Sequence, residues 1–203
     1  MESKAFDRIF GTIVFGLALF FVPFCAGWWL SYLFGSGSNS FLHIGIALGA
    51  AGGVAANLFW LKRLVAGLYS MNTWAMLCLL VLYSISLFGF FMGVPVFNVL
   101  AGILTGIYIG RQAKMLNYDA AHFSARLKIA QYVALSLLLL VCVTSAILAL
   151  SDSYTAANLE GMFSLSFSLS TPLLVSIIFI GGTILLLAQF VLTKVSATLA
   201  YKS

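Results

Sequence analysis

The sequence predicts an all-α, polytopic integral membrane protein with six transmembrane helices, arranged as three hairpins, and with both termini in the cytoplasm. Of its 203 residues, 63% are hydrophobic and only 7% are charged, whereas soluble domains carry about 25% charged residues because their surface must be hydrated. Several apolar runs exceed the roughly 18 residues that cross a bilayer. With six crossings, all ten Lys and Arg residues fall on one side, which membrane insertion keeps cytoplasmic. They are Lys4, Arg8, Lys62, Arg63, Arg111, Lys114, Arg126, Lys128, Lys194 and Lys202.

The six predicted spans follow from the apolar runs and from the basic residues that flank them. They are residues 9–34, 41–61, 74–92, 95–110, 129–150 and 172–193 of a single membrane domain, residues 1–203. Pro23 cannot donate to the hydrogen-bond ladder of the first span and is expected to kink it. The first run is longer than the roughly 7–15 apolar residues of a cleaved signal peptide, so we expect a retained signal anchor.

The connection between the third and fourth spans, Gly93-Val94-Pro95, contains no polar side chain. Exposed non-helical backbone is unfavourable in lipid, so neighbouring helices are expected to shield this turn. A re-entrant pair in place of these two spans would put Arg111 and Lys114 outside and break the asymmetry of the basic residues. Two full crossings are therefore predicted.

Residues 111–128 form the main cytoplasmic segment, and their apolar residues recur at helical spacing. We predict a short amphipathic helix on the inner leaflet, with Asn117 capping its start and Asp119 in its first turn. An ordinary basic loop is an equal alternative. The residues expected to contact lipid or a partner are Arg111, Lys114, Phe123, Arg126 and Lys128.

The outer loop before the sixth span contains Asp152 and Glu160, the two charged residues that the six crossings place outside. It ends in residues 163–170, where apolar residues and serines alternate strictly. Such alternation is typical of a half-buried strand, and a helical lead-in to the sixth span is an equal alternative. Thr171-Pro172 is typical of an N-cap followed by proline at the first helical position.

Glycines mark the three spans that return to the cytoplasm. Small residues at four-residue spacing allow the backbones of two membrane helices to approach closely. The predicted packing residues are Gly49, Gly53, Gly102, Gly106, Gly110, Gly181 and Gly182. The contact can form within the chain or with another subunit.

Residues that carry chemistry are scarce. No Lys, Arg or carboxylate lies within a predicted span, which argues against a proton relay or a charged ion filter. GxSG and HExxH motifs are absent from the sequence, and His43 and His122 fall on opposite sides of the membrane. The three cysteines form no CxxC pair. We therefore expect no catalytic residues, no metal site and no cofactor, and the lack of a basic stripe with interleaved aromatics argues against nucleic acid.

The remaining polar side chains fall at two depths. Near the outer surface, Trp28, Trp29, His43 and Asn98 are candidates for one pocket that binds a neutral or weakly polar solute. A belt of separate side chains facing the headgroups is the alternative. Near the inner surface, Asn57, Gln131 and Gln189 are expected to hydrogen-bond neighbouring helices.

In outline the chain resembles the substrate-binding membrane subunits of energy-coupling-factor vitamin transporters, which are small, basic, six-span proteins with both termini inside. The resemblance covers the topology of the whole chain and rests on no specific residue. The outer loop at residues 35–40 is shorter than the lid loop of that family. We expect a transport-related subunit of a bacterial inner membrane, which binds or passes a small solute. The alternative is a non-catalytic membrane interaction or regulatory partner of another membrane complex. The expected partners are the lipid bilayer and either another membrane or cytoplasmic subunit or further copies of the chain in a homo-oligomer.

Overall fold

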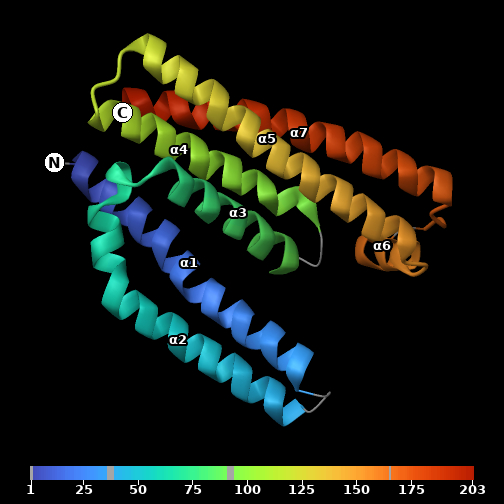
Figure 1. Ribbon diagram of the computed structural model, residues 1–203. Coiled ribbons are helices and arrows are strands. Elements are labelled where there is room, and N and C mark those ends of the chain that lie inside the picture. The colour runs from blue at the N-terminus through green and yellow to red at the C-terminus, as the bar shows by residue number, and fades with distance from the viewer. Residues whose placement is uncertain (1, 36–38, 91–93, 165) are drawn as a thin grey trace. The chain divides into compact units, whose positions relative to one another are not determined.

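The computed structural model describes residues 2–35, 39–90, 94–164 and 166–203, and these residues form helices and short connections without a β-strand (Figure 1). In chain order the elements are α1 (Glu2–Phe34), α2 (Asn39–Ala66), η1 (Leu68–Ser70), α3 (Thr73–Phe90), η2 (Pro95–Asn98), α4 (Val99–Met115), α5 (Ala120–Ser151), α6 (Thr155–Phe163) and α7 (Thr171–Lys202). The helices α1, α2, α5 and α7 are long and apolar enough to cross a membrane. The all-α class is thus confirmed, together with four helices fit to span a bilayer.

The chain forms two compact units, unit 1 (Met1–Ser86) and unit 2 (Leu87–Ser203). In unit 1, α1 and α2 lie side by side as an antiparallel hairpin (Figure 1). Their backbones approach closely at glycines: a Cβ added at Gly49 would lie 3.0 Å from Phe24 Cα, and one added at Gly53 would lie 3.0 Å from Phe20 Cα. This spacing is tighter than ordinary van der Waals contact, so glycine permits the packing of the hairpin.

Polar side chains add further links within unit 1. The amide Nδ2 of Asn57 on α2 donates to Gly16 O of α1 at 3.2 Å and to Gly53 O of its own helix at 3.0 Å. The hydroxyl of Tyr83 on α3 donates to Val14 O of α1. These bonds satisfy polar groups between apolar helices.

In unit 2, α4 and α7 are parallel neighbours and α5 packs antiparallel against both (Figure 1). The glycine row of α4 faces α7. A Cβ added at Gly102 would meet Gln189. One added at Gly106 would meet Thr193 and Ser196, and one added at Gly110 would meet Ala197 and Ala200. These pairs keep a constant offset of 87 residues (Gly102 to Gln189, Gly110 to Ala197). Extended to Pro95, this offset brings the start of η2 about level with Gly182 of α7.

The structure of residues 111–128 differs from the predicted amphipathic helix. Helix α4 continues to Met115, a turn with Asn117 in the left-handed region (φ 52) follows, and α5 begins at Ala120. Asp119, not Asn117, is the N-cap, and its Oδ1 accepts from the His122 backbone N at 2.8 Å. This bond and the His122 side chain hold the pKa of the Asp119 carboxyl below its usual value. The apolar periodicity is explained by packing, because Phe123 is buried against α7.

The alternating segment at 163–170 contains no strand among its described residues. Helix α6 ends at Phe163, Ser164 is left-handed (φ 50), and residues 166–170 have no regular structure; residue 165 lies outside the described part of the chain. Helix α7 begins at Thr171 with Ser170 as its N-cap, one residue before the predicted cap, and with proline in its first turn. The turn predicted at 93–95 lies partly outside the described residues.

Candidate functional site

Unit 2 has a polar interior. Its buried polar side chains are Asn98, Arg111, Gln112, Gln131, Gln189 and Thr193. Gln189 is 1% exposed, and with its amide oriented to satisfy both atoms, Nε2 donates to Val99 O at 3.1 Å and Oε1 accepts from Gly102 N at 3.2 Å. Gln131 on α5 donates from Nε2 to Phe190 O of α7 at 3.1 Å. All three inner amides, Asn57 in unit 1 and Gln131 and Gln189 in unit 2, therefore bond the backbone of a neighbouring helix, as the sequence predicted.

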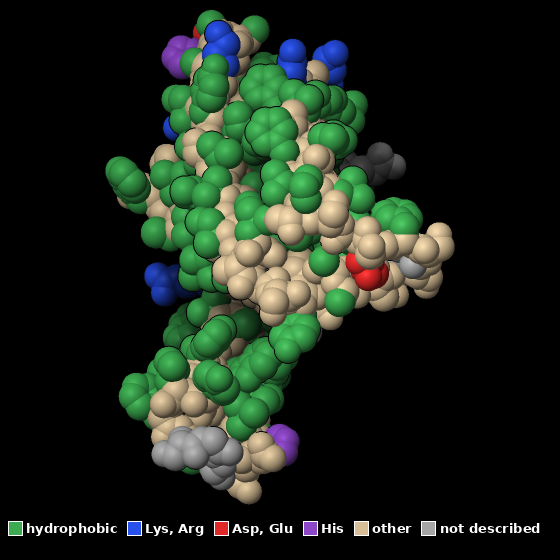
Figure 2. All heavy atoms as spheres, turned by 90° about the vertical axis from the view of Figure 1, so that its right-hand side faces the viewer, with side chains coloured by type: hydrophobic (Ala, Val, Ile, Leu, Met, Phe, Trp, Pro, Cys, Tyr) green, Lys and Arg blue, Asp and Glu red, His purple; other side chains and the backbone are tan. Residues whose placement is uncertain are grey.

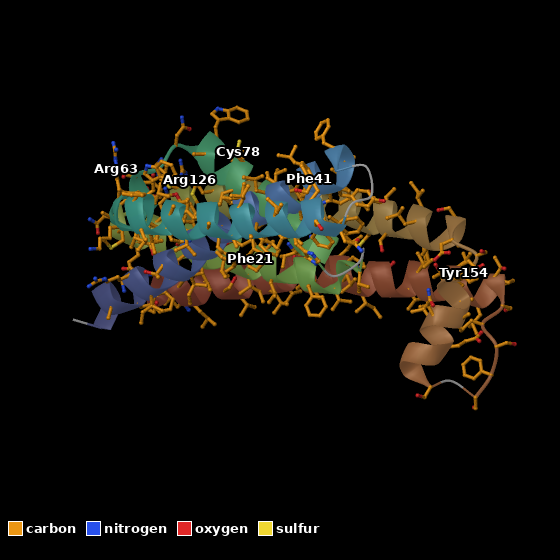
Figure 3. All side chains as sticks on the ribbon, turned by 90° about the horizontal axis from the view of Figure 1, so that it is seen from below. Phe21, Phe41, Arg63, Cys78, Arg126 and Tyr154 are labelled. Atoms are coloured by element: carbon orange, nitrogen blue, oxygen red, sulfur yellow. The ribbon has the colours of Figure 1, made fainter. Side chains whose placement is uncertain are left out.

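The cytoplasmic candidates lie at the end of unit 2 where α4 turns into α5, far from Tyr154 at the start of α6 (Figure 3). Arg126 donates from Nη1 to Gln112 Oε1 at 2.8 Å, and its guanidinium carbon lies 5.5 Å from the centre of the Tyr118 ring. The hydroxyl of Tyr201 on α7 donates to Tyr118 O at 2.8 Å. The connection between α4 and α5 is thereby fixed against the end of α7. Among the other candidates, Arg111 is buried, Lys114 is partly buried and Lys128 is exposed.

Sequence reasoning missed the roles of Gln112, Tyr118 and Tyr201. Gln112 lies fourteen residues from Arg126, and Tyr201 lies 83 residues from Tyr118. The two residues of each pair lie on different elements, Gln112 on α4 with Arg126 on α5, and Tyr118 in the turn before α5 with Tyr201 on α7, so only the fold brings them together. The available signal was weaker, namely the presence of several tyrosines and a glutamine beside basic residues at one predicted membrane boundary.

The outer candidates are divided between the units. Trp28, Trp29 and His43 belong to unit 1 and are exposed near the end of the hairpin where α1 passes into α2, and Trp29 lies about level with His43. Asn98 belongs to unit 2, where it closes η2 and is only 2% exposed. Exposed indoles at a helix end are typical of an interfacial belt. A pocket shared by all four residues stays a prediction.

The glycine candidates also fall into two groups. Gly49, Gly53, Gly102, Gly106 and Gly110 each lie against the backbone or a side chain of a neighbouring helix. A Cβ added at Gly181 or Gly182 would meet no described atom within 4 Å. Gly182 and Gly181 lie seven and eight residues before Gln189, on the same face of α7. By the α4–α7 offset, both are close to the level at which η2 begins.

No group of three His, Cys, Asp or Glu side chains that could hold a metal ion occurs in the part of the chain that the structure describes. No protein-family model, curated protein or solved structure matches the chain.

Proposed function

We propose that the chain crosses the membrane six times, with α3 and the combined η2–α4 segment as the two shorter crossings and with both termini in the cytoplasm. Helix α3 has 18 residues, and η2 and α4 together run from residue 95 to residue 115. Segments of this length can reach across a hydrocarbon core of about 30 Å. The positions of the ten basic residues support the orientation.

Cysteine labelling tests this topology. In a chain without its three native cysteines, Asp119→Cys should react with a membrane-impermeant maleimide only after the cytoplasmic side is opened. Asp152→Cys should react in intact cells. Labelling of Asp119→Cys from the outside alone would rule out the six-span arrangement.

We propose further that the protein is a transport-related membrane subunit that binds or passes a neutral or weakly polar small solute. The observation that carries this proposal is the short reach of the η2–α4 segment along α7 (Figure 1). The 3-10 turn η2 leads directly into α4. The 87-residue offset of the α4–α7 contacts, extended to Pro95, brings the start of η2 about level with Gly182, the twelfth of the 32 residues of α7. About 16 Å of α7 extends beyond that level at roughly 1.5 Å per residue. The η2–α4 crossing therefore starts short of the Thr171 end of α7, and helix ends at such depth commonly line the binding sites of transporters.

The residues around this level suit an uncharged solute. The face of α7 that contacts α4 continues to Gly181 and Gly182, where an added Cβ would meet no described atom within 4 Å. Asn98, at the end of η2, is a buried polar side chain of the same unit, and the α4–α7 offset gives it a similar level along α7. No described Lys, Arg, Asp or Glu occurs in α7 between Thr171 and Thr193. An amide beside smooth, apolar backbone can orient a polar group without attracting an ion.

A pair of glycine substitutions tests the solute site. A Cβ added at Gly182 or at Gly161 would meet no atom of the described residues within 4 Å, so replacing either with Leu should leave the fold intact. We expect small molecules extracted from purified wild type and Gly161→Leu to include one compound in near-stoichiometric amount by mass spectrometry. Gly182→Leu should retain at least tenfold less of it, because the side chain fills the site. If no compound differs between the two variants, the site is not at this level.

The second candidate function is a non-catalytic partner of another membrane complex. It is favoured by the broad apolar surface of unit 2, where α5 exposes Leu140, Val143 and Ile147 and α7 exposes Phe179 and Ile184. Lipid can cover such a surface, and so can a partner helix. Co-purification of a stoichiometric partner chain, with no solute retained, would favour this candidate over the first.

A further inference from the structure

Arg126 is a cation held in a fixed position. Its Nη1 donates to the neutral Gln112, and its guanidinium lies over the Tyr118 ring. Both contacts orient the planar group, and Tyr118 is itself held by the hydroxyl of Tyr201. A guanidinium carries five N–H donors, and the bond to Gln112 uses only one of them. The position of this charge is therefore set by the fold, whereas most of its donors remain available.

No carboxylate pairs with Arg126 among the residues that the structure describes. The nearest acidic residue in the sequence, Asp119, pairs with His122 at 3.0 Å, and both side chains are largely exposed. Asp152 and Glu160 lie at the other end of unit 2, after α5. Among the described residues, Arg126 is thus contacted by a neutral glutamine and an aromatic ring and by no opposite charge, and an external anion can complete its coordination.

The surroundings of Arg126 indicate where that anion comes from. On the next turns of α5, Ile129 and Tyr132 are 65% and 63% exposed, and an exposed tyrosine beside an apolar stretch is typical of a membrane interface. On the other side of Arg126 is the polar turn before α5. In Figure 2, Lys and Arg side chains gather beside a His at the upper end of the view, above a mainly hydrophobic surface. The guanidinium therefore lies where apolar surface meets charged surface.

We propose that Arg126 binds the phosphate of an anionic phospholipid, whose acyl chains lie along the exposed apolar residues of α5. A guanidinium suits this ligand because its paired N–H donors match two phosphate oxygens. The adjoining apolar surface favours a lipid over free phosphate, since it has a place for the hydrocarbon chains. The site is independent of the proposed solute site near Gly182, and it extends the expected lipid contact of Arg126 to a defined ligand.

Lipid binding to the full chain in mild detergent tests the site, with native mass spectrometry as the readout and phosphatidylglycerol and phosphatidylcholine as the probes. We expect phosphatidylglycerol to bind wild type at least tenfold more tightly than it binds Arg126→Gln. Lys62→Gln, which removes the same charge in unit 1, should bind within twofold of wild type. Arg126→Lys should be intermediate, because it keeps the charge and loses the paired donors.

Three results would overturn the proposal. The first is equal affinity of wild type and Arg126→Gln for phosphatidylglycerol, and the second is equally tight binding of phosphatidylcholine. The third is displacement of the lipid by millimolar inorganic phosphate, which would assign the site to free phosphate. If Arg126→Gln does not fold, Tyr118→Leu serves in its place. It removes the ring beneath the guanidinium at unchanged charge, and it should also weaken phosphatidylglycerol binding, so that wild-type affinity of this variant would count against the site.

Discussion

Replacing Gly106 with Leu is expected to destabilise unit 2 by about 1–3 kcal/mol, the usual cost of overpacking a tight interface. An added Cβ would overlap Ser196 Oγ and Thr193 O and would lie 3.1 Å from Ala197 N. Two of these three atoms belong to the α7 backbone, which cannot move aside as a flexible side chain can. The helices must then separate, and the packing along the whole α4–α7 contact weakens.

Thermal unfolding of the purified chain in detergent measures this effect. Far-UV circular dichroism is the suitable signal, because all four tryptophans lie in unit 1. Gly161→Leu is the control, since its Cβ also meets no described atom within 4 Å and Gly161 lies on α6, outside the proposed solute site. Leu104 is partly buried on α4, the helix of Gly106. Leu104→Ala should lower the stability less than Gly106→Leu does. Melting of Gly106→Leu at the wild-type temperature would show that α4 and α7 are not in close contact.

The helical class and the glycine rows could be predicted from the sequence because both depend on local patterns. Apolar runs longer than about 18 residues define membrane helices, and glycines four residues apart lie on one helix face. The surfaces that oppose these glycines could not be predicted. Gly106 contacts Thr193 and Ser196, which are two hydroxyl residues of a helix far away in the sequence, and no periodicity of α7 singles them out.

The segment at residues 111–128 shows why boundaries between helices are harder to predict. Its apolar residues follow a helical period. This period occurs both in a helix that lies on a membrane surface and in the first turns of a helix that packs inside the protein. Phe123 and Leu127 belong to the second kind, because they are buried with Ala197 of α7. The N-cap depends on a single backbone conformation: Asp119 is extended and accepts from His122, whereas Asn117 is left-handed and closes the preceding turn.

The outer pocket depends on an inference that depth alone cannot support. Trp28, His43 and Asn98 were grouped because the predicted spans place them at similar distances from the outer surface. Depth says nothing of the direction in which a side chain points around its helix. In the structure Trp28 and His43 are exposed on unit 1, whereas Asn98 is buried in unit 2. The inner amides were more predictable, since a buried amide in lipid needs a partner whichever way it faces.

Replacing Gln189 with Met is expected to lower the stability of unit 2 by about 1–2 kcal/mol, within the range for a buried amide that loses its partners inside a membrane protein. The side chain is 1% exposed and bonds Val99 O and Gly102 N, both of them backbone atoms in the first turn of α4. Methionine has a similar volume and flexibility, so the change removes the two bonds and leaves the packing largely intact. These bonds hold the start of α4 at its level on α7, so their loss should also loosen the 3-10 turn η2 that precedes it.

The matched control for Gln189→Met is Thr183→Val on the same helix. Thr183 is exposed, and its hydroxyl donates only to Phe179 O of its own helix at 2.8 Å. Its replacement removes one hydrogen bond without separating two helices, and the melting temperature should change little. Hydrogen exchange measured by mass spectrometry should show faster exchange at residues 95–102 in Gln189→Met alone, because the carbonyl of Val99 and the amide of Gly102 lose their link to α7. If Gln189→Met and Thr183→Val have the same melting temperature and the same hydrogen-exchange rates at residues 95–102, the Gln189 amide does not join α4 to α7.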